Sequence, residues 1–353
     1  MPQDDDSPQM TLEDVAALVG VSRTTVSNVV NGTGRVSKDT ASKIGAVLQS
    51  TGFTVNASAR TLRRKSSQLI SVLVPIYQDA DSFPKENPFY WDFFSGLQGV
   101  THSGGYQILL QRMNPTDEFV PVIRARNLDG VVVVGAYESL APVPHLLASK
   151  IPAIFVDSYL PSLSAHTVNV DDQFGAYLAT RYLLGLGHRN IVFVSEPLLE
   201  HGVNNERWYG YCQALSENRL AGEPISIEAQ TSLEAGRSLA HRLAYDRSKI
   251  SAIVTAADIL AIGLLRGFHE CGVTVPQRMS VIGFDDIRHA QYTVPTLTTI
   301  RQDSFGKGEK TGQLLLRLIE SHRTGHKLDV QHIQLTPTLV VRESTGPAPA
   351  IEA

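Results

Sequence analysis

Apolar residues recur with two different periods along the chain. Over the first fifty residues they are spaced three or four apart, as in TLEDVAALVG, where Leu12, Val15, Ala16 and Val19 share one helical face. From Leu69 onward, continuous apolar runs such as LISVLVPI and GVVVVGA alternate with segments of helical period. The first pattern predicts a small helical unit, and the second predicts a larger body of alternating strands and helices.

Three helices are predicted in the small unit. Thr11 and Asp14 have the spacing of a capping box at the start of the first helix, and Gly20 suits its left-handed end. Ser22 is the expected cap of a second helix in VSRTTVSNVVNG, and SKDTASKIGAVLQSTGF supplies a third. Two helices joined by a tight turn of this kind indicate a helix-turn-helix.

Short polar groups occupy the exposed start of the second helix. Arg23, Thr24, Ser27 and Asn28 are suited to contacts with base edges and phosphates. The segment 10–66 carries eight Lys and Arg residues against three Asp and Glu, a net charge of +5, whereas the whole chain has −4. A basic end on an acidic body favours DNA binding by that end over the alternative, a three-helix bundle without a nucleic-acid role.

Two series of strands are predicted in the body. One comprises LISVLVPI, YQILLQ, GVVVVGA and AIFVDS, and the other comprises IVFVS, PISIEAQ, AIVTAA and SVIGFDD. Continuous apolar strands alternating with helices indicate parallel sheets covered on both faces. We therefore expect two α/β subdomains, with ligands bound beyond the carboxyl ends of the strands.

Polar groups stand at those carboxyl ends. Asp157, Asp258, Asp285 and Asp286 follow apolar runs, and Arg207 opens the segment ERWYGYCQAL. Each aspartate could equally cap a helix or close a turn.

Composition limits the remaining classes. The 353 residues are 42% hydrophobic, and no apolar run approaches the roughly 18 residues of a membrane span. The start, MPQDDDSPQM, lacks the apolar region of a signal peptide, so we expect a cytoplasmic, nucleoid-associated protein without membrane contact. Cys212 and Cys271 are far apart and are expected to be small buried hydrophobes, with no metal and no cofactor.

Several motifs together resemble the LacI/GalR family of bacterial transcription regulators. The resemblance rests on TLEDVAALVGVSRTTVSNVVNG in the small unit and on LGLGHRNIVFVS, ERWYGYCQAL, ADILAIGLLRGFHECGVTVPQRMSVIGFDD and PTLTTIRQD in the body. It implies a small all-α helix-turn-helix headpiece plus an α/β periplasmic-binding-protein-like core of two doubly wound parallel-sheet subdomains. The implied boundaries are a headpiece at 10–55, a hinge helix or linker at 56–66, a core at 67–342 (subdomain one at 67–168 and 299–328, subdomain two at 169–298 and 329–342), and a disordered tail at 343–353.

The resemblance also implies a set of DNA contacts. The residues are Thr11, Ser22, Arg23, Thr24, Thr25, Ser27, Asn28, Asn31, Val36 and Ser37 in the headpiece, and Asn56, Ala59, Arg60 and Leu62 in the hinge. Within NASARTLRRKS, Leu62 takes the position of a leucine that wedges into a central base step of the minor groove, opposite its two-fold mate. The implied partner is double-stranded, pseudo-palindromic operator DNA bound by a homodimer.

A small-molecule effector is the second implied partner. The family's effector contacts fall on Phe89, Tyr90, Asp157, Asn205, Arg207 and Asp285. Charged and planar groups suit a sugar or sugar derivative, with a purine or other metabolite as the alternative. We therefore expect a repressor of carbohydrate-utilisation genes that is switched by such an effector.

Two other protein classes compete with this interpretation. The chain has no GxSxG, no HExxH and no GxGxxG after a strand, so no enzymatic activity is expected. The body alone would suit a transport binding protein, but the headpiece argues against that class.

Overall fold

A computed structural model describes residues 10–31, 33–51, 66–75, 88–113, 119–199, 201–218, 222–245 and 250–349. The chain divides into two units, residues 1–67 and residues 68–353. Among the described residues no helix is long and apolar enough to span a membrane.

The first unit contains the three predicted helices. They are α1 (Leu12–Val19), α2 (Arg23–Asn31) and α3 (Lys38–Ser50). Thr11 and Asp14 form the expected capping box, and Gly20 ends α1 with a φ of 74°. The core consists of Val15, Ala16, Val26 and Ile44, one or two from each helix. The helix-turn-helix prediction is therefore confirmed.

The second unit has two six-stranded sheets, as predicted. In the first subdomain the strand order is β11-β5-β4-β3-β1-β2, and all neighbouring strands are parallel. The strands are β1 (Leu69–Pro75), β2 (Gln107–Met113), β3 (Gly130–Val134), β4 (Ala153–Val156), β5 (His166–Val170) and β11 (His332–Leu335).

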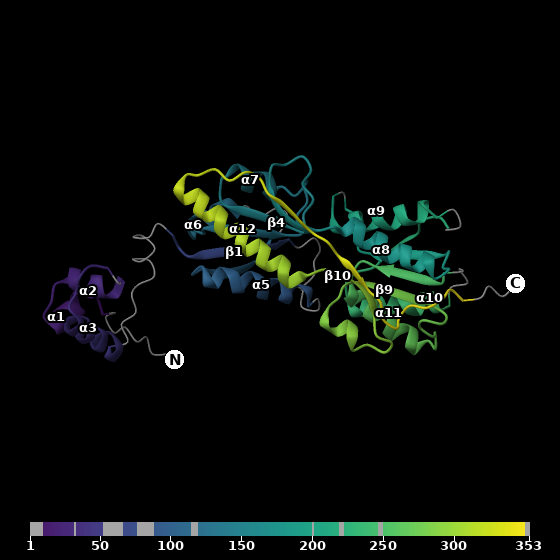
Figure 1. Cartoon of the computed structure of the whole chain (residues 1–353), viewed down its shortest axis with the longest axis horizontal. Helices are drawn as coiled ribbons and strands as arrows, with labels where there is room; N and C mark the ends of the chain where they lie inside the picture. The colour runs from purple at the N-terminus through teal and green to yellow at the C-terminus, as the bar shows by residue number, and fades with distance from the viewer. Residues whose placement is uncertain are drawn as a thin grey trace, which may run out of the picture. The chain divides into compact units, whose positions relative to one another are not determined.

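Helices cover both faces of this sheet. On one face lie α5 (Phe89–Ser103) and α12 (Ser304–Thr324), which run side by side (Figure 1). On the other face lie α6 (Phe119–Ala125) and α7 (Pro142–Ala148). Alternate residues of each strand enter the two cores: Val131 and Val133 face α6 and α7, and Val132 and Val134 face α12.

The second subdomain repeats this architecture. Its strand order is β12-β10-β9-β8-β6-β7, parallel except for the antiparallel edge strand β12. The strands are β6 (Ile191–Ser195), β7 (Ser226–Glu228), β8 (Ala252–Thr255), β9 (Ser280–Asp285), β10 (Thr298–Arg301) and β12 (Thr338–Val340), and a short 3-10 helix, η1 (Arg288–Gln291), follows β9.

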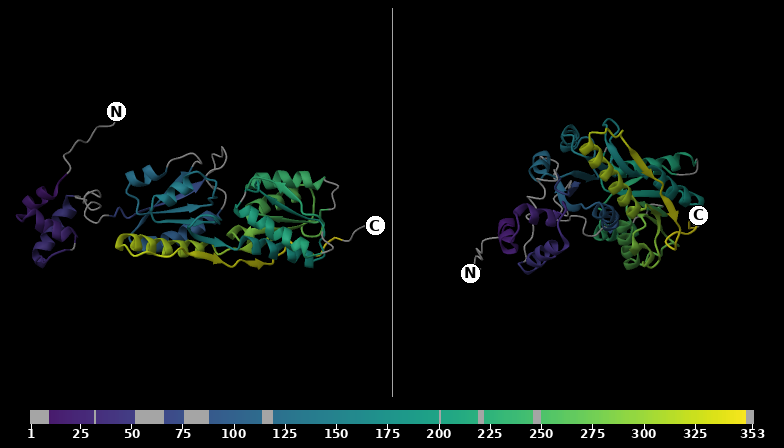
Figure 2. Two further views of the ribbon diagram at one scale, coloured as in Figure 1. Left: turned by 90° about the horizontal axis from the view of Figure 1, so that it is seen from above. Right: turned by 60° about the vertical axis from the view of Figure 1, so that its left-hand side comes forward.

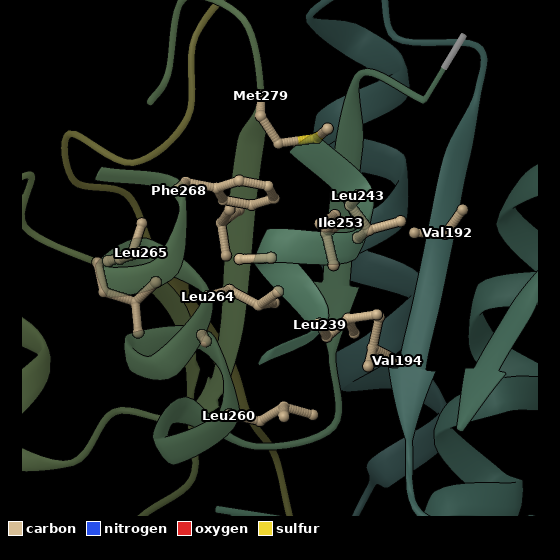
Figure 3. Packing of buried hydrophobic residues seen from close by; sticks show 14 of the residues in the cluster. Val192, Val194, Leu239, Leu243, Ile253, Leu260, Leu264, Leu265, Phe268 and Met279 are labelled. Carbon is tan, nitrogen blue, oxygen red and sulfur yellow. The ribbon is translucent and has the colours of Figure 1, made fainter. Parts of the chain in front are cut away.

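Two helix pairs enclose the second sheet. The first pair is α8 (Asp172–Gly185) with α9 (Val203–Ser216), and the second is α10 (Leu233–Ala244) with α11 (Asp258–Glu270). Figure 3 shows the core beneath the second pair, where Leu239, Leu264 and Phe268 pack against strand residues such as Val192 and Ile253.

Glycines allow these helix pairs to touch along their backbones. A methyl group on Gly308 of α12 would overlap the carbonyl oxygen of Phe93 in α5. Likewise, a methyl group on Gly210 of α9 would overlap the carbonyl oxygen of Gln173 in α8. Neither contact can relax by a side-chain rotation, because backbone atoms meet on both sides.

The chain crosses between the subdomains three times, and each crossing differs from the predicted boundary. The first lies at Asp171, between β5 and α8, the second at residues 302–303, between β10 and α12, and the third at residues 336–337, between β11 and β12. Residues 169–170 and 329–335 therefore belong to the first subdomain, and residues 299–301 belong to the second. In Figure 2 the yellow end of the chain runs from the first subdomain into the second along the third crossing.

The prediction of a disordered tail from residue 343 is wrong for residues 343–349. Ser344 is buried, where it accepts a hydrogen bond from the Thr298 amide and donates one to the Val281 carbonyl. The Gly346 carbonyl lies 3.0 Å from Nε2 of the buried His188. The segment is ordered because its backbone closes the amino-terminal end of the second sheet.

Candidate functional site

The start of α2 presents the predicted DNA-reading groups. Ser22 caps this helix as predicted, accepting a hydrogen bond from the Thr25 amide at 3.1 Å. Among the predicted contact residues Thr11, Ser22, Arg23, Thr24 and Ser37 are exposed, whereas Thr25, Ser27, Asn28 and Val36 are half-buried. The side chain of Asn31 and all of Asn56, Ala59, Arg60 and Leu62 lie outside the described residues.

Arg23 already has a partner. Its Nε atom lies 2.7 Å from Oε1 of Glu13 in α1, and both side chains are more than 60% exposed. An exposed ion pair of this kind contributes little to stability. The guanidinium of Arg23 can therefore exchange Glu13 for a phosphate or a guanine edge at small cost.

The predicted effector residues come from four segments at the carboxyl ends of the strands. Phe89 and Tyr90 begin α5, which follows β1, and Asp157 follows β4. Asn205 and Arg207 lie in the first turns of α9, which follows β6, and Asp285 ends β9. The strand ends of both sheets thus supply these side chains, as expected for parallel sheets.

A buried lysine contacts two of these side chains directly and is linked to a third through a glutamine. Nζ of Lys307, in α12, lies 2.6 and 2.9 Å from the two carboxylate oxygens of Asp157 and 2.7 Å from Oε1 of Gln302. Its ammonium also lies 4.6 Å from the ring centre of Phe89. Nε2 of Gln302 donates to Oδ1 of Asp285 at 2.5 Å. Asp157 of the first subdomain is thereby connected to Asp285 of the second.

Arg207 belongs to a second buried network of hydrogen bonds. Its Nε atom donates to Oδ1 of Asp172 at 2.7 Å, its Nη1 atom donates to the Ala256 carbonyl, and its guanidinium lies 3.8 Å from the ring centre of Phe284. The hydroxyl of Tyr159 donates to Oδ2 of Asp172 at 2.8 Å. Burial alone would lower the pKa of Arg207, but the surrounding carboxylates outweigh it and raise that pKa.

Burial dominates the protonation behaviour of this region. It raises the pKa of Asp285 to about 6, against the opposing effects of Arg207 and of the hydrogen bond from Gln302. It also raises the pKa of Asp157, which Lys307 partly counteracts. The pKa of Tyr90 is raised by burial and then by nearby carboxylates, so its phenol stays neutral and its ring meets Phe89 edge-on. The site therefore combines two carboxylates with an aromatic pair.

The backbone is unusual at both carboxylates. Asp157 has a φ of 49° and Asp285 has a φ of 121°, which are conformations that residues with side chains rarely adopt. Such positions persist where the surrounding structure fixes them, and they gather at ligand sites.

Asn205 and two of the strand-end aspartates are not part of these two hydrogen-bonded networks. Asn205 is half-buried, and within the described part of the chain its side chain makes no hydrogen bond. Asp258 accepts hydrogen bonds from Thr299 and the Ile287 amide, and Asp286 pairs with Arg301 and Arg342. The strand-end aspartates 258 and 286 therefore have structural partners within the second subdomain.

Sequence reasoning missed Lys307, Gln302 and Asp172. A signal for Lys307 was present, because Thr311, Leu314 and Leu318 follow it at helical spacing and all face the core. A lysine on the apolar face of a helix needs a buried partner. Asp172, by contrast, looks like an ordinary first-turn residue in the sequence.

Comparisons with known proteins agree with both parts of the molecule. Residues 11–56 match the family of bacterial regulatory proteins named lacI, and residues 180–345 match the periplasmic binding protein-like domain. The HTH-type transcriptional regulator DegA of Bacillus subtilis (strain 168) is 32% identical over 354 residues, which cover 96% of this chain and 98% of DegA.

Solved structures give the same result. The lac repressor dimer bound to operator and the anti-inducer ONPF has a TM-score of 0.81 at 25% identity, covering 96% of this chain and 99% of that chain. A LacI family transcriptional regulator from Enterococcus faecium with bound ribose has a TM-score of 0.68 at 28% identity, covering 79% of this chain and 99% of that chain. The chain described here therefore belongs to the lacI family and is a DNA-binding transcriptional regulator.

Proposed function

We propose that this protein is a repressor that binds a pseudo-palindromic operator as a homodimer and is released by a sugar or sugar derivative. The observation that carries the effector part of the proposal is the buried chain from Asp157 through Lys307 and Gln302 to Asp285. A ligand that contacts both aspartates favours one arrangement of the two subdomains over another.

The headpiece supports sequence reading. Arg23 and Thr24 are exposed at the start of α2, and we assign base contacts to them and to the neighbouring polar residues named above. A homodimer presents two copies of this helix, which matches a palindromic site. The lac repressor dimer bound to operator, with its TM-score of 0.81, supports this arrangement.

The hinge assignment rests on the sequence of residues 56–66. We propose that Leu62 wedges into the central base step and that Arg60 contacts phosphate. The wedge forms only on a bent, specific site, so it couples operator affinity to the spacing of the two hinge segments.

Unused bonding capacity supports a hydroxyl-rich effector. Within the described residues Nη2 of Arg207, Oδ2 of Asp285 and the amide of Asn205 have no hydrogen-bond partner. Hydroxyl groups both donate and accept, so a polyol can satisfy all three. The rings of Phe89 and Tyr90 offer an apolar face beside them. The Enterococcus faecium regulator with bound ribose supports a sugar over a purine or other metabolite.

Release follows from differential binding. An effector shifts the protein between two arrangements only by the difference in its affinity for them. Typical coupling free energies are about 1–3 kcal/mol and act equally on effector and operator affinity. The protein would act in the cytoplasm, on the nucleoid.

Asn205 provides the sharpest test, because its side chain makes no hydrogen bond to the described residues that a substitution would remove. A thermal-shift screen of sugars and nucleobases first identifies a ligand. Asn205→Ala should then weaken that ligand about tenfold, the value of one hydrogen bond of roughly 1.4 kcal/mol. Operator binding without ligand should stay unchanged.

Gln213→Ala is the matched control, since Gln213 carries a longer amide on the exposed side of the same helix. It should leave ligand and operator binding unchanged. If Asn205→Ala kept full ligand affinity, Asn205 would not be a contact. If no sugar raised the melting temperature and a nucleobase did, the effector class would be wrong.

A further inference from the structure

The charged groups at the proposed effector site do not balance. Three carboxylates, those of Asp157, Asp172 and Asp285, accompany two cations, Arg207 and Lys307, so the formal charge is −1. All five side chains are largely buried, with Lys307 wholly so. Low-dielectric surroundings strengthen the effect of this excess negative charge on any ligand.

Other titratable groups nearby do not reverse the sign. Those that act on Asp285 and Tyr90 from neighbouring elements include Asp258 and Glu196, and both are acidic. No further Lys, Arg or His side chain is paired with the buried carboxylates of Asp157 and Asp172 in the described structure.

The two cations differ in what they can offer a ligand. An ammonium group has three donors, and those of Lys307 all have acceptors, namely both oxygens of Asp157 and Oε1 of Gln302. An anionic ligand group would have to take Lys307 away from Asp157 and leave that carboxylate buried without a cation. Arg207 uses its Nε donor on Asp172 and one Nη1 donor on Ala256, so its Nη2 donors and the second Nη1 donor remain available.

We infer that the effector is a sugar without an anionic group, rather than a sugar phosphate or sugar acid, and that Lys307 sets this specificity by supplying the cation that Asp157 requires. The inference rests on the proposed sugar response. A neutral polyol leaves the Lys307–Asp157 pair intact and uses the remaining donors and acceptors. A phosphate ester adds about two negative charges beside the excess one, because its second pKa is near 6.

The probes are D-glucose, D-galactose and D-ribose, each with its phosphate ester and its amino-deoxy analogue, titrated calorimetrically into the full-length protein. For the sugar that binds, the phosphate ester should bind about a hundredfold more weakly, as expected for like charges a few ångströms apart at intermediate dielectric. The amino analogue should bind at least as tightly as the parent sugar, because its ammonium meets the excess negative charge, and the ratio of the two affinities is the reference for the variants.

Two variants test Lys307 itself. In Lys307→Met, Asp157 lacks its cation, and the ammonium of the amino sugar can take that place. The preference for the amino analogue over the parent sugar should then exceed the wild-type ratio by at least about tenfold, a factor worth about 1.4 kcal/mol. The Asp157→Asn/Lys307→Met protein, which has neither charge, should lose this gain. Lys310→Met, at an exposed lysine of the same helix, should behave as the wild type.

Each outcome decides a separate point. A phosphate ester that binds as tightly as its free sugar overturns the inference and leaves the sugar response standing. A gain for the amino analogue that persists in the double variant, or that fails to occur in a folded Lys307→Met protein, overturns the role of Lys307. If no probe binds, the proposed sugar response is wrong and the inference falls with it. The wild-type titrations decide the effector's charge even if Lys307→Met does not fold.

Discussion

Replacing Lys307 by methionine should destabilise the first subdomain strongly. The change removes two charge-assisted hydrogen bonds to Asp157, of 2.6 and 2.9 Å, one hydrogen bond to Gln302, and a cation–ring contact with Phe89. Breaking a buried ion pair by removing one partner costs about 3–5 kcal/mol, because the other charge stays buried. The Asp157→Asn/Lys307→Met protein should lose only about 1–2 kcal/mol, since an unpaired amide costs less than an unpaired charge. Asparagine is the suitable replacement at a φ of 49°.

The destabilisation should also depend on pH. Burial raises the pKa of Asp157, and the loss of Lys307 removes the group that opposes this rise. A carboxyl whose pKa is higher in the folded than in the unfolded protein binds more protons when folded, so stability falls as pH rises through that window. Lys307→Met should therefore be least stable at pH 8 and should regain stability as the pH falls toward 5.

Guanidinium unfolding followed by tryptophan fluorescence measures both effects. The chain has two tryptophans, and Trp91 of α5 reports the first subdomain while Trp208 of α9 reports the second. In a Trp208→Phe background the Lys307→Met transition should move to lower denaturant at fixed protein concentration. Lys310→Met is the control and should stay within about 0.5 kcal/mol of the wild type. A loss below about 1 kcal/mol at pH 8, or one independent of pH, would refute the reasoning.

Four other changes test the remaining assignments. Glu13→Gln should tighten operator binding several-fold at low salt, because Arg23 loses a competing partner and the headpiece loses a negative charge. Fluorescence anisotropy at two salt concentrations would measure the affinity, and equal or weaker binding would contradict the role given to Arg23. Leu62→Ala should weaken binding to the specific operator markedly and to random DNA little, since only the specific site is wedged, and an equal loss on both DNAs would exclude a wedge. Asp285→Asn should raise the melting temperature at pH 7.5 and leave it nearly unchanged at pH 4. The reason is that a folded pKa of about 6, above the unfolded value, lowers wild-type stability as pH rises through about 4 to 6; parallel profiles for both proteins would count against this. Gly210→Val should cost more than about 3 kcal/mol or prevent folding, because its side chain would overlap the backbone of α8, and a near-wild-type melting temperature would show that the helices separate easily.

The sequence predicted the architecture but not the path of the chain between subdomains. Continuous apolar runs identify buried parallel strands whichever sheet they enter, so the two sheets followed from the pattern. The sequences HIQL and TTIR do not indicate which of the two sheets each strand joins. Residues 329–335 and 299–301 were therefore assigned to the wrong subdomain.

The site was predicted in the same partial way. Asp157, Arg207 and Asp285 were candidates because they stand at strand and helix ends and because the family resemblance places effector contacts on them. Lys307 and Asp172 were not, because their importance comes from partners 150 and 35 residues away. Such pairings depend on how helices pack across the sheet, which local periodicity does not encode.

Because the chain crosses between the subdomains three times, neither sheet of the body can finish folding until the chain is almost completely synthesised. Ribosomes deliver the N-terminus first, and folding units complete as their last strand emerges. The helices of the headpiece are complete by residue 50, but the first sheet waits for α12 and β11, and the second waits for β12 at residue 338 and the closing segment that ends near residue 349. An interrupted synthesis product would therefore carry the operator-reading helices without a finished body, and it would occupy DNA non-specifically without any response to the effector.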